Sequence, residues 1–345
     1  MKRLNNSKIS MVLFVFAAAI VLAGSANADF NFGTPVNLGP SINSSSGEGG
    51  MISPDDCTMY IASDRPGGYG DWDVYVATRE SRDSEWGPAV HLEPPLSTVN
   101  ADIVWSISVD GLSLYLYSDR PGGRGNFDIW VTTRATTSAP WGTPVNLGST
   151  INSSSYEYQP DISSDGLSLY FSSNRAGGRG SYDLWVTTRT TTSAPWGTPT
   201  NLGSTVNSSS GDYQPSISAD GLSLFFVSVR PGGLGYDEDI WVTTRASVSD
   251  PWGTPVNLGP QINTPAADFC PSISADGSTF YFTSSGRGGY GYYDVFQALI
   301  FSVPTCGDLE HPYPVGDLNE DCHVDIADLE MLIDHWLECT APDCE

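Results

Sequence analysis

The sequence predicts an all-β protein: a five-bladed β-propeller closed by its N-terminal strand, followed by a small C-terminal module built from a calcium loop and a helix. Three observations support this prediction, namely five copies of one repeat, a pattern of four strands in each copy, and a fourth strand that the last copy lacks and the N-terminal region supplies. The copies are marked by Asp73, Asp128, Asp183, Asp239 and Asp294, which lie 55, 55, 56 and 55 residues apart. A period of this length is typical of solenoids and propellers.

Residues 1–28 have the features of an export signal. A basic start is followed by an apolar run from 11 to 24, and Ala26-Asn27-Ala28 fits the small-residue pattern of a cleavage site. The apolar run is too short to span a bilayer, with an uncleaved anchor as the alternative. We therefore expect an extracellular or cell-surface protein without a membrane span.

The chain is strongly acidic, with 15 basic and 40 acidic residues and a net charge of −25 at pH 7. Both lysines and one arginine belong to residues 1–28, so the exported part is more acidic still. Such a surface repels nucleic-acid phosphate and anionic lipid. The composition argues against both as partners and favours cations, calcium among them.

Residues 158–203 show how one repeat is built. A short strand over 159–163 ends at the turn Ser164-Asp165-Gly166, and a second strand covers 167–173. A Gly-rich loop leads to a third strand over 183–189, and the Pro-containing stretch 196–203 suits an outer edge strand. Four antiparallel strands with no helical pattern predict a propeller blade.

The fifth copy ends after its third strand, near residue 300. The missing Trp-Gly-Thr-Pro-like strand is found at the start of the exported chain, over 32–39. We infer that this strand completes the last blade and closes the ring. An open five-unit solenoid is the alternative, and it would leave strand edges unpaired.

The repeat also carries a family resemblance. Its pattern, P-x-I-S-x-D-G-x-x-L-Y-F-x-S-x-R-x-G-G-x-G-x-x-D-I-W-V, resembles the WD-like repeats of TolB-type β-propellers over residues 30–300. The resemblance implies a propeller domain over 29–302, expected to be monomeric, that binds proteins or surfaces. It implies no single chemistry.

A carboxylate and an arginine recur in each repeat, in loops that open on the same face of a propeller. The carboxylates are Glu48, Asp102, Glu157, Asp212 and Asp268, and the arginines are Arg65, Arg120, Arg175, Arg230 and Arg287. One interpretation is structural, because repeated residues often pair within or between blades. The other is a ring of acids at the channel mouth that binds a cation or sugar hydroxyls.

Departures from the repeat are the stronger candidates for binding. Aromatic residues cluster in and beside the Gly-Gly-x-Gly loops, where they could stack on sugar rings, anchor a protein, or pack between blades. They include Tyr69, Trp72, Phe127, Tyr182, Tyr236, Tyr290, Tyr292 and Tyr293. Trp105 stands where other blades have proline or glycine, so it is a further candidate.

Other motifs carry little weight as sites. The Gly-Gly-x-Gly loops join two strands, so no helix follows to hold a phosphate. With four histidines in the chain, a Ser-His-Asp triad has little support. Asn43, Asn152 and Asn207 fit either glycosylation triplets or turns. Cys57 is expected to be a small core residue, unbonded to Cys270 because the two fall at opposite ends of a blade.

After residue 302 the period disappears, and 303–345 reads as a separate module. Oxygen donors stand at five positions of a calcium-loop pattern, with the backbone carbonyl of His323 as a further ligand. The five donors are Asp317, Asn319, Asp321, Asp325 and Asp328. The alternative is an acidic helix cap without a metal.

This tail resembles the calcium loop of dockerin modules, in which aspartate is usual at the last ligand position. A complete dockerin has two such halves and this tail has one, so binding to a cohesin-like protein is a weaker expectation than calcium binding. Its cysteines, Cys306, Cys322, Cys339 and Cys344, have disulfide-like spacing. Three pairings are possible, of which we favour Cys322–Cys339 with Cys306–Cys344.

The sequence thus favours a secreted, non-catalytic propeller that binds a protein or glycan and is attached to a larger assembly by its calcium-binding tail. The alternative is a glycoside hydrolase or other polysaccharide-acting enzyme. Such enzymes need two carboxylates of distinct character, whereas the repeated carboxylates are equivalent by symmetry.

Overall fold

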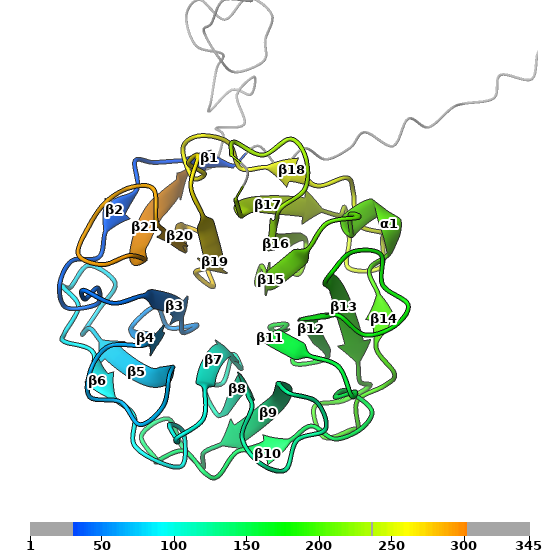
Figure 1. The fold of residues 1–345 in the computed structure, drawn as a ribbon, viewed down its shortest axis with the longest axis horizontal. Helices are drawn as coiled ribbons and strands as arrows, with labels where there is room; N and C mark the ends of the chain where they lie inside the picture. The colour runs from blue at the N-terminus through cyan, green and yellow to red at the C-terminus, as the bar shows by residue number, and fades with distance from the viewer. Residues whose placement is uncertain (1–29, 236, 302–345) are drawn as a thin grey trace, which may run out of the picture.

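Four four-stranded sheets and one five-stranded sheet are arranged in a ring as the blades of a propeller (Figure 1). The structure, a computed structural model, describes residues 30–235 and 237–301. Within these residues the predicted all-β, five-bladed propeller is confirmed. One element departs from the prediction: α1 (Gly203–Val206) forms a single helical turn just after the fourth strand of the third blade.

The first four blades use consecutive strands, each running from the channel outward. They are β3 (Glu48–Ile52), β4 (Thr58–Ser63), β5 (Asp73–Thr78) and β6 (Val90–His91); β7 (Asp102–Ile107), β8 (Ser113–Ser118), β9 (Asp128–Thr133) and β10 (Val145–Asn146); β11 (Glu157–Ile162), β12 (Ser168–Ser173), β13 (Asp183–Thr188) and β14 (Thr200–Asn201); and β15 (Asp212–Ile217), β16 (Ser223–Ser228), β17 (Asp239–Thr244) and β18 (Val256–Asn257). All strand pairs within these blades are antiparallel.

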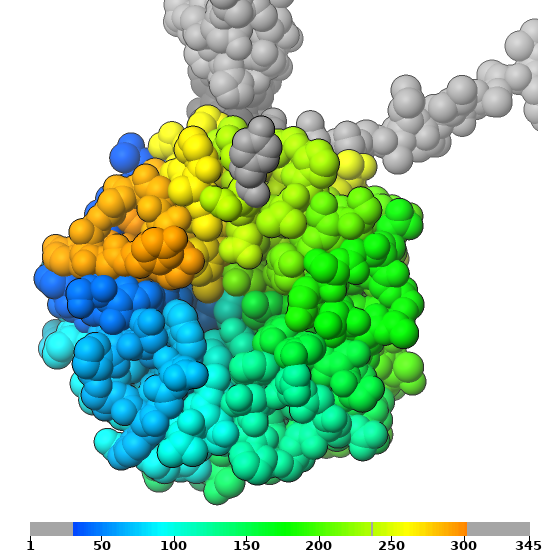
Figure 2. Space-filling view, viewed as in Figure 1, coloured from blue at the N-terminus to red at the C-terminus, as the bar shows by residue number. Residues whose placement is uncertain are grey.

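The fifth blade combines the two ends of the propeller. Its inner strands are β19 (Asp268–Ile273), β20 (Thr279–Ser284) and β21 (Asp294–Phe301). The outer edge of β21 pairs with β1 (Asn31–Phe32) and β2 (Val36–Asn37), with Asn37 opposite Phe296. Figure 2 shows these N-terminal residues, in blue, packed against the last blade, in orange. Closure by the N-terminal strand is therefore confirmed.

A polar network joins the first blade to the last. The Tyr281 hydroxyl donates to Asp56 Oδ1 at 2.7 Å and accepts from Arg79 Nη2 at 3.0 Å. Arg79 also forms an ion pair with Asp56 at 2.9 Å. Asp56 has φ 56° in the hairpin turn where other blades have glycine, so its carboxylate is available for this junction without loss of the turn.

The Gly-Gly-x-Gly loops are held by the strand-three aspartates. In the third blade, Asp183 Oδ1 accepts the Gly180 amide at 3.1 Å, and Oδ2 accepts the Asn201 side-chain amide at 3.1 Å. A Cβ on Gly178 would lie 2.1 Å from Asp183 Oδ2, and one on Gly180 would lie 1.5 Å from the Ser210 carbonyl oxygen. These glycines are required by close packing, not by a phosphate.

The Trp-Gly-Thr-Pro segment is fixed by the arginine that ends the third strand. The Arg189 guanidinium lies 4.2 Å from the centre of the Trp196 ring and donates to the Gly166 carbonyl at 2.7 Å. The same stacking recurs in Arg79–Trp86, Arg134–Trp141 and Arg245–Trp252. Cation–π contacts of this kind stabilise the first four blades.

Other predictions about single residues have clear outcomes. Asn43, Asn152 and Asn207 are buried and bond to the backbone of strand three, for example Asn152 to Ile129, so the turn interpretation is confirmed. Cys57 and Cys270 are unbonded, as expected. Cys57 is partly exposed, however, so its prediction as a core residue is wrong: its place beside the hairpin turn leaves it at the surface.

None of the helices in the described part of the chain has the length and apolar character needed to cross a membrane. Residues 1–29, Tyr236 and 302–345 lie outside the described residues. The predicted export signal, the calcium loop and the four cysteines of the tail therefore stay predictions.

Candidate functional site

The five repeated carboxylates begin the innermost strands, and each is at most 1 % exposed. In the second blade, Asp102 Oδ1 lies 2.5 Å from Arg120 Nη2 and accepts the Ser118 hydroxyl at 2.6 Å. Equivalent ion pairs are Arg65–Glu48, Arg175–Glu157 and Arg230–Asp212. Since each of these four carboxylates is paired with an arginine of its own blade, the contacts agree with a structural role.

The fifth blade differs slightly. Arg287 donates to the carbonyl oxygens of Gln261 and Ile262, and Asp268 accepts the Thr264 hydroxyl at 2.8 Å. Burial raises the pKa of the Asp268 carboxyl. Over residues 30–235 and 237–301, no group of three or more His, Cys, Asp or Glu is placed to hold a metal ion.

The displaced position of Glu48 has a structural explanation. In the other inner strands the register shifts at a bulge, as between Tyr158 and Asp161. Gln159, Gln214 and Cys270 have positive φ in these bulges. Strand β3 pairs with β4 without a shift, so it is one residue shorter. Glu48 therefore occupies the same place as the other four carboxylates.

The predicted rim residues Tyr69 and Tyr290 are about half exposed, at 51 % and 52 %. The Tyr69 hydroxyl donates to Glu93 at 2.5 Å, which raises its pKa. Both rings lie in Gly-Gly-x-Gly loops and neither lines the cavities of the channel described below. They are accessible to solvent on the face that these loops form, which we call the loop face.

Trp105, which the sequence marked as a binding candidate, lies inside the channel and is 3 % exposed. Its indole nitrogen donates to the Pro215 carbonyl at 3.3 Å, which links the second blade to the fourth. Trp105 and Met51 line two cavities, one on each side. They therefore lie between a cavity at the loop face and one at the opposite face, which carries the Asp-Gly hairpins.

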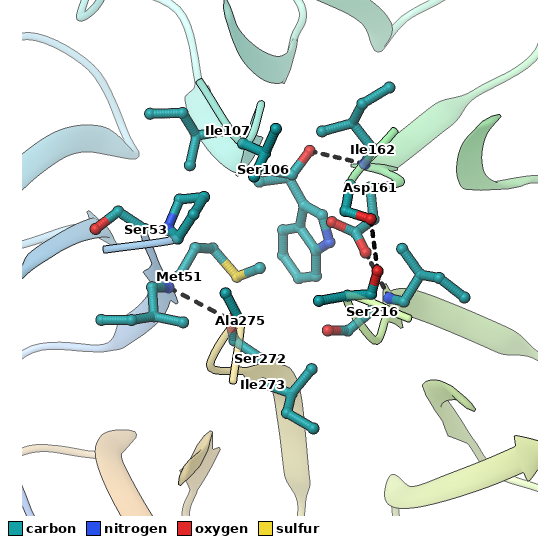
Figure 3. A pocket seen from close by; sticks show the side chains of 17 residues that line it. Met51, Ser53, Ser106, Ile107, Asp161, Ile162, Ser216, Ser272, Ile273 and Ala275 are labelled. Carbon is teal, nitrogen blue, oxygen red and sulfur yellow. Dashed lines mark hydrogen bonds between the residues drawn. The ribbon is translucent and has the colours of Figure 1, made fainter. Parts of the chain in front are cut away.

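The cavity at the hairpin face is small, about 90 Å³. Hydrogen bonds between neighbouring inner strands surround it, including Ser106 with Ile162 and Ser272 with Ile52 (Figure 3). Asp161 takes the place of these serines in the third blade, and its Oδ2 accepts the Ile217 amide at 2.6 Å. Burial raises the pKa of Asp161 to about 7.

The cavity at the loop face is larger and aromatic, with a volume of about 340 Å³. We call it the aromatic cavity. Among the described residues, seven rings line it: Trp72, Trp105, Tyr117, Phe127, Tyr158, Phe269 and Tyr293. All but Trp105 are partly exposed. Its size and apolar walls are those of a small-ligand site.

These rings form a connected lining. Tyr117 lies between Trp105 and Tyr158, with ring centres 6.1 and 5.2 Å away. On the other side, Phe269 meets Tyr293 edge-on at 4.8 Å. Because the rings hold one another in place, the cavity is largely preformed.

Glu238 breaks the pattern of this lining. It directly precedes the strand-three Asp239, a position that the other blades fill with Trp72, Phe127, Tyr182 and Tyr293. Its side chain lines the aromatic cavity, and burial raises its pKa. No described residue forms a hydrogen bond or ion pair with its carboxylate.

Sequence reasoning missed Glu238 because the fourth repeat has one additional loop residue, which drew attention to Tyr236. Counting back from Asp239 would have found the substitution of carboxylate for an aromatic ring. Tyr117, Tyr158 and Phe269 were also missed, since only the ring of blades brings their strands to one cavity.

Cys270 also lines the aromatic cavity and is buried. Burial raises the pKa of its thiol to about 12, so the thiol stays protonated at neutral pH. Its amide donates to the Gln214 side chain at 2.6 Å. These features are those of an inert packing residue.

Comparisons with solved structures find propellers of several kinds. A putative TolB from Agrobacterium tumefaciens is 18 % identical, with 70 % of this chain and 71 % of that chain covered and a TM-score of 0.44. The catalytic domain of a Coprinopsis cinerea GH62 α-L-arabinofuranosidase is 13 % identical, with 79 % of this chain and 97 % of that chain covered and a TM-score of 0.49. An endo-arabinase from Bacteroides thetaiotaomicron is 15 % identical, with 79 % of this chain and 98 % of that chain covered and a TM-score of 0.47.

No protein-family model matches the chain, and no curated protein matches it. The likeness to solved structures is one of fold, and TolB-like propellers are among those neighbours. It does not extend to an activity.

Proposed function

We propose that the propeller is a glycan-binding module whose ligand occupies the aromatic cavity. The observation that carries this proposal is the connected set of partly exposed rings around a preformed cavity that opens on the loop face. Aromatic faces stack on the apolar faces of sugar rings, and polar groups such as Gln214 and Glu238 are available for hydroxyls. Four of the five repeated carboxylates form ion pairs with arginines of their own blades, so they support this role mainly as scaffold.

We also propose that the protein acts outside the cell and is attached to a larger assembly through its tail. Support comes from the sequence: the signal-like residues 1–28 and the calcium-loop pattern from Asp317 to Asp328. Calcium would be held by carboxylate and amide oxygens of this loop, and the partner is a protein, with a cohesin-like one suggested by the resemblance. Calcium titration of the full chain tests it, because Asp317→Ala should abolish the heat of binding.

Glycan binding is tested on an array of plant, algal and animal glycans, followed by titration of the ligands found. Trp72→Ala should weaken binding at least about tenfold, since it removes an accessible ring from the cavity. Tyr290→Ala is the matched control, because it removes an exposed ring of the same face that lies outside the cavity. Equal affinity of both variants and the wild type would refute the cavity as the site.

A second candidate function, a polysaccharide-acting hydrolase, is favoured by one observation. Glu48 and Glu238 both line the aromatic cavity but differ in environment, since Glu48 is paired with Arg65 and Glu238 has no such partner among the described residues. Two carboxylates of distinct character are what glycosidases need. Release of reducing sugar by the wild type, abolished in Glu238→Gln, would establish this function in place of simple binding.

A further inference from the structure

The charged side chains that line the aromatic cavity are all negative. Two carboxylates, Glu48 and Glu238, line it, and no arginine, lysine or histidine of the described residues does. The arginine that each repeat places after its second strand is engaged elsewhere: Arg65, for example, bonds to the Ile42 carbonyl, Ser63 and Glu48 Oε1. A ligand in this cavity therefore meets acceptors and aromatic rings, and no cationic side chain from the part of the chain that the structure describes.

Both carboxylates have unused acceptor capacity. Glu238 has no hydrogen-bond or ion-pair partner among the described residues. Glu48 uses Oε1 for Arg65, Ser44 and Ser63, while Oε2 is buried and has no partner in the described part of the chain. A buried acceptor without a donor is costly unless a ligand or water satisfies it.

The rings around Glu238 add to the same preference. Glu238 lines the cavity together with Phe269 and Tyr293, whose rings meet edge-on at 4.8 Å. The faces of Trp, Tyr and Phe rings attract cations through their quadrupole. A carboxylate next to several ring faces in a partly desolvated site is the arrangement that recognises an organic ammonium group.

We infer that the aromatic cavity selects glycans that carry a protonated amine, with the ammonium group donating to Glu238 and resting against the neighbouring rings. This inference rests on the proposed glycan-binding function and specifies its ligand class. The hydroxyls of a neutral glycan can donate to the carboxylates but leave the charge of Glu238 without a counter-charge. An acidic glycan would be repelled by them and by the strongly acidic chain.

The test compares a tetramer of glucosamine with its N-acetylated counterpart, which differs in the charge on nitrogen. Affinities are measured by titration calorimetry on the full chain. A salt concentration of about 0.15 M limits the non-specific attraction of a polycation to an acidic protein. We expect the glucosamine tetramer to bind at least tenfold more tightly than the acetylated one. Glu238→Gln should weaken binding of the glucosamine tetramer at least tenfold.

Glu80→Gln is the matched control, because it removes the same charge from an exposed position outside the cavity. It should bind as the wild type does. Affinity of the glucosamine tetramer that is equal in the wild type and Glu238→Gln would overturn the inference, since attraction would then be non-specific.

The two proposals fail in different ways. Equal binding of both tetramers, weakened by Trp72→Ala and unaffected by Glu238→Gln, would overturn the inference and leave glycan binding intact. Binding of neither tetramer, with no glycan bound on the array, would overturn both.

Discussion

The Trp105 indole nitrogen donates to the Pro215 carbonyl at 3.3 Å, across the channel from the second blade to the fourth. Most other inter-blade contacts described above join sequential neighbours. This contact joins blades that are not adjacent, and the indole separates the aromatic cavity from the smaller one beneath it. Trp105 therefore forms part of the base of the candidate site.

Trp105→Phe should lower the free energy of unfolding by about 1 kcal/mol more than Trp185→Phe. Both substitutions remove the same volume from buried positions, but the Trp185 indole nitrogen has no partner among the described residues. Urea denaturation of the two variants measures the difference. Equal losses would show that the Pro215 contact contributes nothing to stability.

Asp161→Asn should flatten the pH dependence of stability between pH 4 and 8. The Asp161 pKa is about 7 in the folded protein and about 4 when unfolded, so the folded state holds one more proton over this range. Stability contributed by the neutral carboxyl is then complete below pH 4 and is lost as the pH rises to 7. The loss is about 4 kcal/mol if the shift is fully realised.

The measurement is the difference in unfolding free energy between the wild type and Asp161→Asn at each pH, which cancels the contribution of other groups. The unfolding free energy of the variant, relative to that of the wild type, should rise from pH 4 to 7 and stay constant above pH 7. A constant difference would mean that Asp161 ionises normally in the folded protein.

Gly180→Ala should destabilise the propeller by roughly 3 kcal/mol or more, because the added Cβ would lie 1.5 Å from the Ser210 carbonyl oxygen and would push two blades apart. Gly142→Ala is the control: its Cβ would lie 3.1 Å from the Thr133 oxygen, a tight but adjustable contact. Thermal unfolding compares them. Similar melting temperatures would contradict the assigned role of this glycine.

Arg120→Met should cost about 3–5 kcal/mol of stability, because it leaves the fully buried Asp102 carboxylate without its charged partner. Arg287→Met should cost less, about 1–2 kcal/mol, since Arg287 bonds to carbonyl oxygens and is more exposed. Chemical denaturation distinguishes the two. A larger loss for Arg287 would mean that the ion pairs are not the main support of the repeated carboxylates.

Several features could be predicted from single residues. The Asp-Gly turns and the Gly-Gly-x-Gly loops have local causes, namely positive φ and close approach. The loops are visible in every copy, and the Asp-Gly turns in every copy but the first. The Phe32–Gly39 segment could be matched to the fourth strand of other repeats by its pattern alone. The site was harder to predict, because Tyr117, Tyr158 and Phe269 are separated in the chain and meet only in the closed ring.

The sequence by itself determined the number of blades, the strand order and the ring closure, because each repeat encodes its own turns and strand pairing. It also pointed to Trp105 as a departure from the repeat. Only the tertiary structure decided that the repeated carboxylates are buried in ion pairs, that Trp105 lies within the channel, and that Glu238 stands among aromatic rings. The physical reason is that burial and partners depend on how neighbouring blades pack, and no single repeat specifies them.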